Sequence, residues 1–396
     1  MAGRRRVSGS SVVALCLLLV SLVACGGPPR AEPVRADVQR VLDLRAAALL
    51  GRDERALLRT GTRSPYDSLR AVPLDDWAYR VTGVRRGGDT VTAETELRYR
   101  VRGFDSGPVS TARTLRLSRD ADGRWRVDSD RPARRSAQQL WDQGAVRAVH
   151  GTHSLVLGVG QSRAALDRYA GLADRAVPAV SDAWHTTWAR RVVVLVPKSL
   201  KGMAGLLGSP ASEYRGIAAV TTGETRARDT APADRVVVNP DAYGALGPVG
   251  RQVVLTHETT HVATRADTSP ATPLWLSEGY ADWVGYRGTD RTPQQAAPEL
   301  AAALTEGRLP TGLPEDDDFG FDGDANALAR AYESGWMACR MIAARWGEER
   351  LGAFYRAVGD HGSRDGAVEA ALSRVLGTTS KEFLGAWRDY VRSELG

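Results

Sequence analysis

Cysteine is scarce in this sequence, and its positions exclude a fold stabilised by disulfides. The 396 residues include three cysteines, of which Cys16 and Cys25 lie near the N-terminus. Cys339 remains, within an apolar run of helical character, so no intrachain disulfide is available to the folded part. We expect Cys339 to be a buried, inert thiol. Stability must therefore come from an apolar core or from a bound metal.

Lysine is almost absent as well. Arginine carries nearly all of the net charge of +6, since only Lys198, Lys201 and Lys381 are lysines. No basic motif interleaved with aromatic residues is present, which argues against nucleic-acid binding. An arginine-rich solvated surface explains the charge, and attraction to an anionic membrane is an alternative. With 43% hydrophobic and 25% charged residues, the chain is neither disordered nor a polytopic membrane protein.

The N-terminus has the pattern of an export signal. Arg4, Arg5 and Arg6 form a positive segment, and Val12 to Val23 is an apolar run too short to span a membrane as a helix. Residues 1–24 are therefore predicted to be a signal peptide, which places the rest of the chain outside the cytoplasm.

The end of this segment, Leu22-Val23-Ala24-Cys25-Gly26, resembles the lipobox of bacterial lipoproteins. The resemblance implies cleavage before Cys25, lipidation of its thiol and a Gly/Pro-rich tether over residues 25–34. Acyl chains on Cys25 would anchor the protein to the outer face of the bacterial cell membrane. An ordinary secretory signal with a coincidental cysteine is the alternative.

Residues 35–130 form the first predicted domain, which mixes α and β structure. Apolar residues from Val34 to Leu49 recur at helical spacing. From Val91 to Val101, apolar and polar residues alternate with the period of a half-buried strand, and Gly87-Gly88-Asp89 forms the hairpin turn before it. A further strand is expected over residues 110–118.

The meander ends in Asp122-Gly123-Arg124-Trp125-Arg126-Val127. A helix followed by such a meander resembles the small SnoaL-like domains, which implies a cone-like α+β domain that can hold a ligand. Because this part contains no constellation of acids or histidines, a spacer or protein-binding module is the favoured interpretation.

Residues 131–150 are polar and rich in arginine, and are predicted to link to a second domain over residues 151–396. The elements expected first in that domain are a helix at Arg163 to Trp188 and strands at Val192 to Val196, Gly216 to Val220 and Arg235 to Val238. Pro248 then opens a helix, and from about residue 270 the chain is mostly helical. The fold class is therefore α+β, a cone-like domain followed by a small mixed sheet and a helical subdomain.

The helix that Pro248 opens carries His257-Glu258-Thr259-Thr260-His261. This spacing puts both imidazoles on one helical face, and neutral imidazole is a good zinc ligand. Glu258 is not needed as a ligand and is free to act as a general base on water at the metal. A catalytic zinc takes three protein ligands, and Glu278 on the next predicted helix supplies the third. One zinc ion per chain is expected.

The five residues from His257 to His261, followed by Trp275-Leu276-Ser277-Glu278-Gly279, resemble the gluzincins, the thermolysin-like and aminopeptidase-N-like metallopeptidases. The resemblance implies a zincin domain with zinc held by His257, His261 and Glu278. It also implies that Asp282, one turn after Glu278, lies behind a ligand histidine and fixes its tautomer. A solvent-facing acid is the alternative for Asp282.

Asp267 is a rival third ligand, because some zincins place an aspartate six residues after the second histidine. That arrangement needs glycine three residues after His261, and this chain has Thr264 there. A residue with a Cβ strains the sharp turn, so Glu278 is favoured.

Tyr332-Glu333-Ser334-Gly335 resembles the Tyr-Glu-Lys-Gly phrase of the aminopeptidase-N-like enzymes, although Ser334 departs from it. The resemblance implies that Tyr332 donates a hydrogen bond to a developing oxyanion. The alternatives are that Tyr332 only packs, or that Tyr280 or His361 is the donor.

The aminopeptidase-N-like enzymes also carry a Gly-Ala-Met-Glu-Asn strand, whose glutamate holds the substrate's free amine. The corresponding segment here, Gly216, Ile217, Ala218 and Ala219 followed by Val220, contains no acid. It can still pair with an extended peptide. The sequence therefore favours an endopeptidase over N-terminal trimming.

A weak calcium pattern lies in the acidic segment from Glu315 to Asn326. Asp322, Asp324, Asn326 and Glu333 stand at EF-hand-like offsets, but Ala327 occupies the position that requires glycine. A solvated loop that caps the next helix is the favoured interpretation, with calcium as the alternative.

The sequence as a whole predicts zinc-dependent hydrolysis of a peptide or protein substrate by a lipid-anchored extracytoplasmic protein. One alternative is a non-enzymatic binding or assembly lipoprotein that keeps the zincin fold. Another is a ligand-binding role of residues 35–130. No feature of the sequence indicates an oligomeric state.

Overall fold

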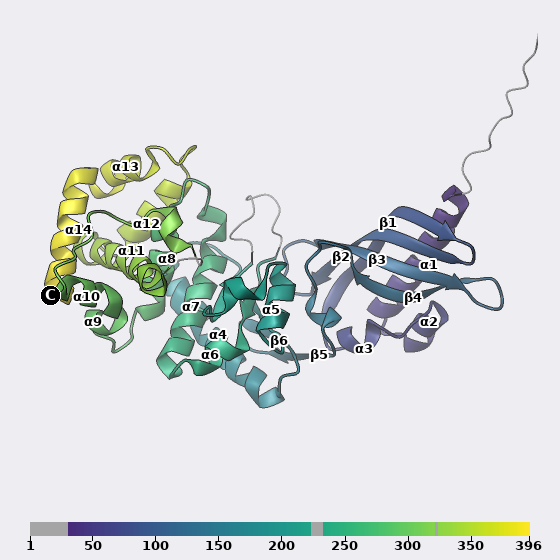
Figure 1. The fold of residues 1–396 in the computed structure, drawn as a ribbon. Coiled ribbons are helices and arrows are strands. Elements are labelled where there is room, and N and C mark those ends of the chain that lie inside the picture. The colour runs from purple at the N-terminus through teal and green to yellow at the C-terminus, as the bar shows by residue number, and fades with distance from the viewer. Residues whose placement is uncertain (1–30, 223–232, 321–323) are drawn as a thin grey trace, which may run out of the picture.

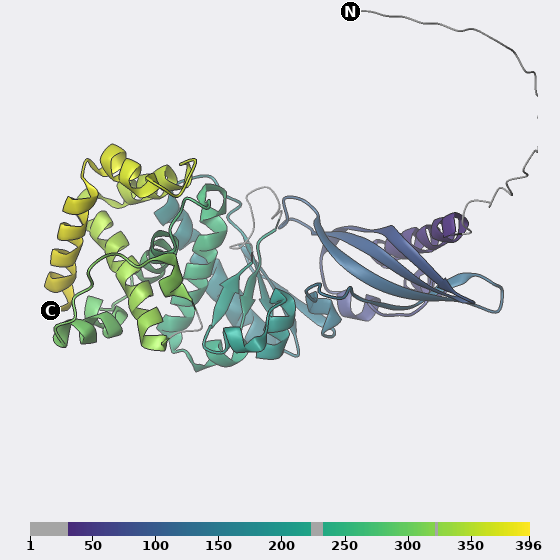
Figure 2. The same cartoon turned by 45° about the horizontal axis from the view of Figure 1, so that its top comes forward.

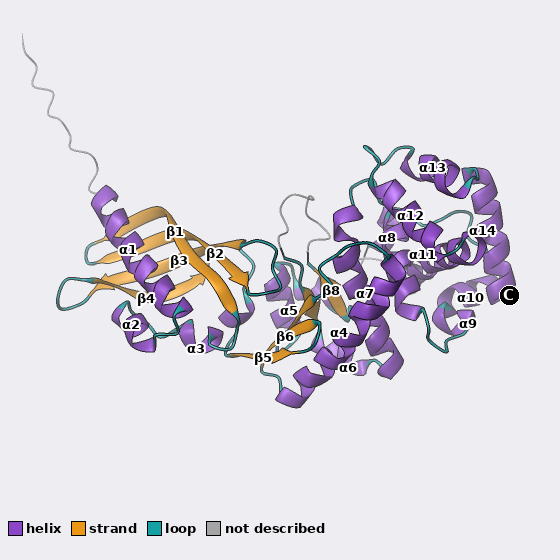
Figure 3. Ribbon diagram, turned by 180° about the vertical axis from the view of Figure 1, so that it is seen from behind, coloured by secondary structure: helices purple, strands orange, loops and turns teal. Residues whose placement is uncertain are grey.

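A computed structural model describes residues 31–222, 233–320 and 324–396. The molecule is elongated and has three parts in a row, an N-terminal sheet, a second sheet and a helical part (Figure 1). The order is the same in the tilted view of Figure 2. Figure 3 shows the strands in the first two parts and helices throughout. The predicted mixture of α and β structure is thus present, with two sheets.

The N-terminal part consists of helices and a four-stranded antiparallel meander in the order β1-β2-β3-β4. Its elements are α1 (Ala31–Leu50), α2 (Glu54–Arg59), α3 (Tyr66–Leu69), β1 (Leu74–Gly87), β2 (Thr90–Val101), β3 (Val109–Arg119) and β4 (Trp125–Pro132). The strand expected at Asp122 to Val127 begins at Trp125 and continues to Pro132.

Alternation along β2 explains how this sheet meets α1. Val91 and Leu97 are fully buried, whereas Glu94 points to solvent. Val38 and Leu42 of α1 are buried in the same core. Burial of each such side chain contributes about 1.5 to 3 kcal/mol, so the apolar face of the sheet holds the helix in place.

The middle part is a mixed sheet flanked by helices. Its elements are β5 (Val146–His150), β6 (Ser154–Val159), α4 (Arg163–Trp184), β7 (Val192–Val196), α5 (Leu200–Leu207), β8 (Ala219–Thr221), β9 (Val236–Val238), α6 (Pro240–Ala245) and α7 (Pro248–Thr264). The strand order is β5-β6-β7-β9-β8, with β8 at an edge. β6, β7 and β9 are parallel, whereas β5 and β8 run antiparallel to their neighbours.

This sheet is covered on both faces. Val194 and Val236 belong to the core under α4 and α7, together with Leu255 of α7. The alternate residues Val193 and Leu195 pack into the core of the N-terminal part. The two sheets therefore share one apolar core, and a buried ion pair at 2.7 Å between Asp105 and Arg235 adds to the contact.

Two expectations for this region need correction. Residues 131–150 are not a free linker, because they carry the end of β4, the buried Leu140 and Trp141, and strand β5 of the second sheet. The strand expected at Gly216 to Val220 is β8, which begins only at Ala219. Strands β5 and β6 were not predicted from the sequence.

The C-terminal part is helical. Its helices are α8 (Leu274–Tyr286), α9 (Pro293–Ala296), α10 (Pro298–Thr305), α11 (Ala325–Trp346), α12 (Glu348–Gly359), α13 (Ala367–Ala371) and α14 (Ser380–Leu395). Their core is rich in aromatic rings, and Trp184 of α4 packs edge-on against Tyr280 and Tyr355. Cys339 is fully buried in this core, and burial raises the pKa of its thiol well above the ordinary value.

The predicted signal peptide, Cys25 and most of the expected tether lie outside the described residues. Helix α1 begins at Ala31, inside the tether expected over residues 25–34. Within the described ranges, no helix combines the length and the hydropathy that a membrane span requires.

Candidate metal centre

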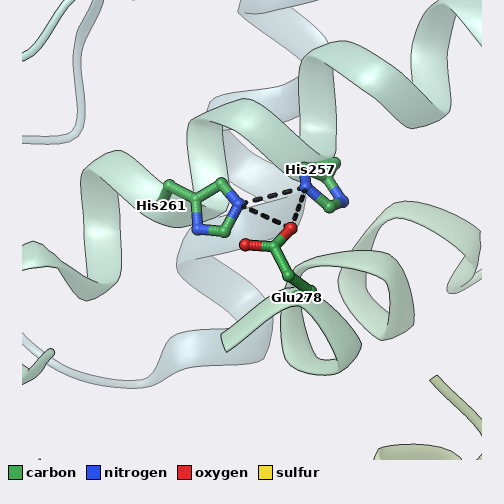
Figure 4. A group of neighbouring side chains, drawn as sticks. All are labelled: His257, His261 and Glu278. Atoms are coloured by element: carbon green, nitrogen blue, oxygen red, sulfur yellow. Dashed lines mark hydrogen bonds and ion pairs between the residues drawn. The ribbon is translucent and has the colours of Figure 1, made fainter. Parts of the chain in front are cut away.

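Two helices bring the three candidate ligands together. Pro248 occupies the first turn of α7, where its missing N–H is tolerated, and the helix continues past His261. His257 and His261 lie one turn apart and face Glu278 of α8 (Figure 4). Pro273 precedes the first residue of α8 and starts that helix.

The nitrogen and oxygen atoms of this group converge. The Nε2 atoms of His257 and His261 are 3.0 Å apart. Oε2 of Glu278 lies 3.2 Å from Nε2 of His257 and 3.5 Å from Nε2 of His261. Two imidazoles and one carboxylate are a donor set that suits zinc and leaves a coordination position for water or substrate. These residues therefore fit a zinc ion.

Asp282 lies beside the ring of His257. Its Oδ1 is 2.8 Å from Nδ1 of His257, on the opposite side of the ring from Glu278. Burial by itself lowers the pKa of His257, but the carboxylates of Asp282 and Glu278 outweigh it and raise that pKa well above the ordinary value. The pKa of Glu278 is lowered, since the two imidazoles outweigh its burial.

Glu258 is buried on α7 and is held by a residue of strand β8. The Thr221 hydroxyl donates to Oε2 of Glu258 at 2.7 Å, and Oγ1 of Thr221 also lies 3.0 Å from the backbone carbonyl oxygen of Glu258. This bond fixes the carboxylate beside the edge strand. Thr221 was not predicted as a site residue, although strand alternation extended by one residue beyond Val220 would have placed it on the same face as Ala219.

Tyr332 lies close to the metal group, on the third turn of α11. Its ring centroid is 6.5 Å from that of His257. Phe319 packs edge-on against Tyr332, with the two ring centroids 5.2 Å apart. Phe319 could not be predicted from the sequence as a neighbour of Tyr332, because it belongs to a short 3₁₀ turn outside any motif.

The alternative hydrogen-bond donors lie elsewhere. Tyr280 is fully buried, and its hydroxyl donates to the Ala183 carbonyl at 3.1 Å. His361 is half-exposed, and its Nδ1 lies 2.7 Å from the carbonyl oxygen of Ser363 in the same loop. Of the three candidates, only Tyr332 makes a ring contact with a candidate ligand.

The rival metal sites do not assemble in the described part of the chain. Asp267 lies in a 3₁₀ turn after α7 and is not part of the group formed by His257, His261 and Glu278. Of the calcium pattern, Asp322 lies outside the described residues.

The remaining members of the calcium pattern make other bonds. Asp324 caps α11 through the Asn326 N–H. Glu333 accepts hydrogen bonds from the backbone N–H groups of Glu299 and Leu300, at the start of α10. The carboxylates of Asp324 and Glu333 therefore do not converge on a cation, and the calcium alternative loses its support.

The expected substrate segment lies beside the metal helix. Asn239 donates its side-chain N–H to the Ile217 carbonyl at 3.0 Å, which fixes the turn before β8. Ala219 is buried against the core under α7, and Val220 is half-buried on the other face of the sheet. Gly216 meets no neighbouring atom at the position of a Cβ. None of these residues is acidic.

Comparisons with known proteins give only distant likenesses. No family model matches the chain, and no curated protein matches it. Two solved structures are similar to it over 80% and 81% of its length, each with 14% sequence identity. One is a two-domain M1 zinc metallopeptidase variant bound to L-arginine, with a TM-score of 0.38. The other is an M1 zinc metallopeptidase variant from Deinococcus radiodurans bound to a Tyr-Ser-Ala substrate, with a TM-score of 0.36.

The chain spans about three fifths of the length of each neighbour, 60% and 62%. TM-scores this low assign neither a fold family nor an activity to the chain. The functional assignment therefore depends on the residues of the metal group and on what surrounds them.

Proposed function

We propose that this protein is a zinc-dependent peptidase of the gluzincin type. The observation that carries the proposal is the convergence of His257, His261 and Glu278 beside the buried carboxylate of Glu258. A structural zinc site takes four protein ligands, whereas three ligands beside a carboxylate suit hydrolysis. When bound, zinc supplies Lewis-acid polarisation of a carbonyl group and lowers the pKa of water.

The residues around the metal group have distinct parts in the proposed reaction. Glu258 accepts a proton from the attacking water and delivers it to the leaving amine. Thr221 holds the Glu258 carboxylate toward the edge strand. Asp282 orients the ring of His257. Tyr332 donates a hydrogen bond to the developing oxyanion.

Strand β8 provides a place for the substrate. It is the edge strand of the second sheet, so an extended peptide can add to it by backbone hydrogen bonds. Because the segment from Gly216 to Ala219 has no acid to hold a free amine, we propose internal cleavage rather than N-terminal trimming.

We further propose that the mature chain begins at Cys25 and is held by lipid at the outer face of the cell membrane. Support comes from the sequence pattern around Cys25. Mass spectrometry of the membrane fraction tests it, because acylation adds a defined mass to the N-terminal peptide and Cys25→Ser removes it. Release of an unmodified soluble chain from wild-type cells would contradict the anchor.

The test of the activity uses the full chain loaded with zinc and a diverse peptide library. Wild-type protein is expected to cleave peptides, and both Glu258→Gln and a chelator are expected to abolish cleavage. Metal analysis must show that Glu258→Gln retains zinc. Glu349→Gln, an exposed acid on α12, is the matched control and should remain active. If wild-type and Glu258→Gln behave alike with zinc bound, the chain is a non-enzymatic protein with a zincin-like site.

A further inference from the structure

A cavity of about 1000 Å³ lies between the N-terminal sheet and the second sheet. This volume is at the upper end of the range for small-molecule sites, about 300 to 1000 Å³, so the cavity can hold large side chains. Tyr99 and Val109 line it from the N-terminal part, and Leu206 lines it from α5. Neither the metal ligands nor Glu258 line it.

The floor of the cavity is a row of apolar side chains that crosses the second sheet to its edge. Leu157 of β6 pairs with Leu195 of β7, Leu195 pairs with Val237 of β9, and Val237 pairs with Val220 of β8. All four residues line the cavity. The row ends at β8, which is the edge strand beside the metal helix.

Strand β8 presents its two faces to two different environments. The Thr221 side chain donates to Glu258 on one face, and Val220 lines the cavity from the other; Thr221 and Thr222 are also among the residues that border the cavity. Ala218 and Thr222 make the backbone bonds to the β9 side, so the backbone groups of Ala219 and Thr221 face the outer edge of the sheet. A peptide that pairs with this edge continues the pleat, and its side chains alternate between the same two environments.

We propose that the cavity receives an apolar side chain of the substrate, at a position next to one that faces the metal group. The N-terminal domain is then one wall of the specificity site, which gives it a part in substrate selection. The inference rests on the proposed peptidase function, since it needs a peptide paired with β8. It adds the substrate class, an extended peptide with a large apolar residue near the cleaved bond.

The walls favour an apolar occupant. Val109, Leu195 and Leu206 are only partly buried and continue the core of the N-terminal part into the cavity. Two arginines are among the residues that line the cavity: Arg235 is paired with Asp105 at 2.7 Å, and Arg135 is exposed to solvent. A basic substrate side chain would lose its hydration beside these arginines without gaining a partner, whereas an apolar one gains contact with the apolar residues of the wall.

The experiment compares cleavage-site profiles of full-length, zinc-loaded variants on one peptide library. Wild-type protein is expected to select a large apolar residue at one position near the cleaved bond. Val109→Trp narrows the cavity, so the ratio of kcat/KM for large over small residues at that position should fall about tenfold or more. Leu206→Ala widens it from another element and should shift the preference toward aromatic residues. Ser118→Trp, on the same strand as Val109 but outside the cavity, should leave the profile unchanged.

The outcomes distinguish failure of the cavity inference from failure of the proposed peptidase function. Glu258-dependent cleavage with a profile that neither Val109→Trp nor Leu206→Ala changes would overturn the inference and leave the peptidase function standing. A wild-type preference for a charged residue at every position near the cleaved bond would also overturn the inference and leave the peptidase function standing. If both variants abolish binding of an apolar fluorescent dye but leave the profile intact, the cavity is a separate ligand pocket and the inference fails. If no cleavage depends on Glu258, the function and the inference fail together.

Discussion

Gly279 of α8 and Gly335 of α11 meet where the two helices cross, with no room for a side chain on either. A Cβ on Gly279 would lie 2.3 Å from the carbonyl oxygen of Gly335, and a Cβ on Gly335 would lie 2.5 Å from the carbonyl oxygen of Trp275. Gly279 follows Glu278 directly, and Gly335 lies three residues after Tyr332. The crossing therefore sets the distance between a candidate metal ligand and the candidate oxyanion donor.

Gly335→Ala is expected to destabilise the protein, because the new methyl group meets rigid backbone rather than a flexible side chain. Overpacking of this kind costs about 1 to 3 kcal/mol, and separation of the helices should also weaken zinc binding. Thermal unfolding and zinc titration measure the two effects. Gly385→Ala on α14 is the control, since a Cβ there meets no atom within 4 Å and alanine favours a helix. Equal melting temperatures for Gly335→Ala and wild type would show that the crossing is not tight.

Thr221 is expected to act as a positioning residue for Glu258. Thr221→Val keeps the shape of the side chain but removes the hydroxyl that donates to Glu258. We expect kcat on a good peptide to fall about 10- to 100-fold with little change in KM, because the carboxylate loses its fixed orientation. Thr221→Ser restores the donor and should recover most of kcat. A purely structural role would affect both variants through stability alone, with kcat of the folded fraction unchanged.

Asp282→Asn is expected to reduce zinc affinity about 10- to 100-fold, because the carboxylate that orients the His257 ring is lost. The amide can still accept a hydrogen bond, so the fold should be retained. Competition with a chromogenic chelator measures the affinity. Asp290→Asn, at an exposed position just after α8, should bind zinc as wild type does. Unchanged affinity in Asp282→Asn would identify Asp282 as an ordinary helix acid.

Local patterns predicted much of the fold and of the metal group. His257 and His261 share a face because a helix repeats every 3.6 residues, and β2 and β7 follow from alternation and from a continuous apolar run. Contacts between distant segments could not be predicted in this way. Thr221 reaches Glu258 only because β8 lies at the sheet edge beside α7, and Phe319 reaches Tyr332 from an irregular segment.

The error over residues 131–150 has a similar cause. Their polar and arginine-rich composition is typical of a linker, but Leu140 and Trp141 are buried against the core that the two sheets share. Composition averages over a segment, whereas packing depends on a few of its residues. The cavity beside β8 was not predictable for the same reason, since its walls come from segments far apart in the sequence.

Tyr332→Phe tests the oxyanion role. The phenyl ring keeps the contacts with Phe319 and His257 but lacks the hydroxyl. Loss of one such donor reduces kcat about 100- to 1000-fold, with KM little changed because the interaction forms in the transition state. Steady-state kinetics on one peptide separates kcat from KM. Tyr390→Phe on α14 is the control and should leave kcat unchanged. A rise in KM without loss of kcat would assign Tyr332 to substrate binding instead.

Glu333 is expected to make stability depend on pH. It is buried on α11, and burial raises its pKa to about 7, although two backbone N–H bonds from α10 favour the charged form. The carboxylates of Glu299 and Asp282 raise it further. A carboxyl whose pKa is higher in the folded than in the unfolded chain binds more protons when the chain is folded. The stability that the protonated Glu333 contributes is therefore fully present below about pH 4.5 and is lost as the pH rises through about 7. Between about pH 5 and pH 8, the free energy of unfolding of the wild-type protein should therefore fall by about 1 to 2 kcal/mol relative to that of Glu333→Gln. Urea unfolding at the two pH values measures the difference. Parallel pH profiles for the two proteins would mean that the α10 N–H bonds keep Glu333 ionised throughout.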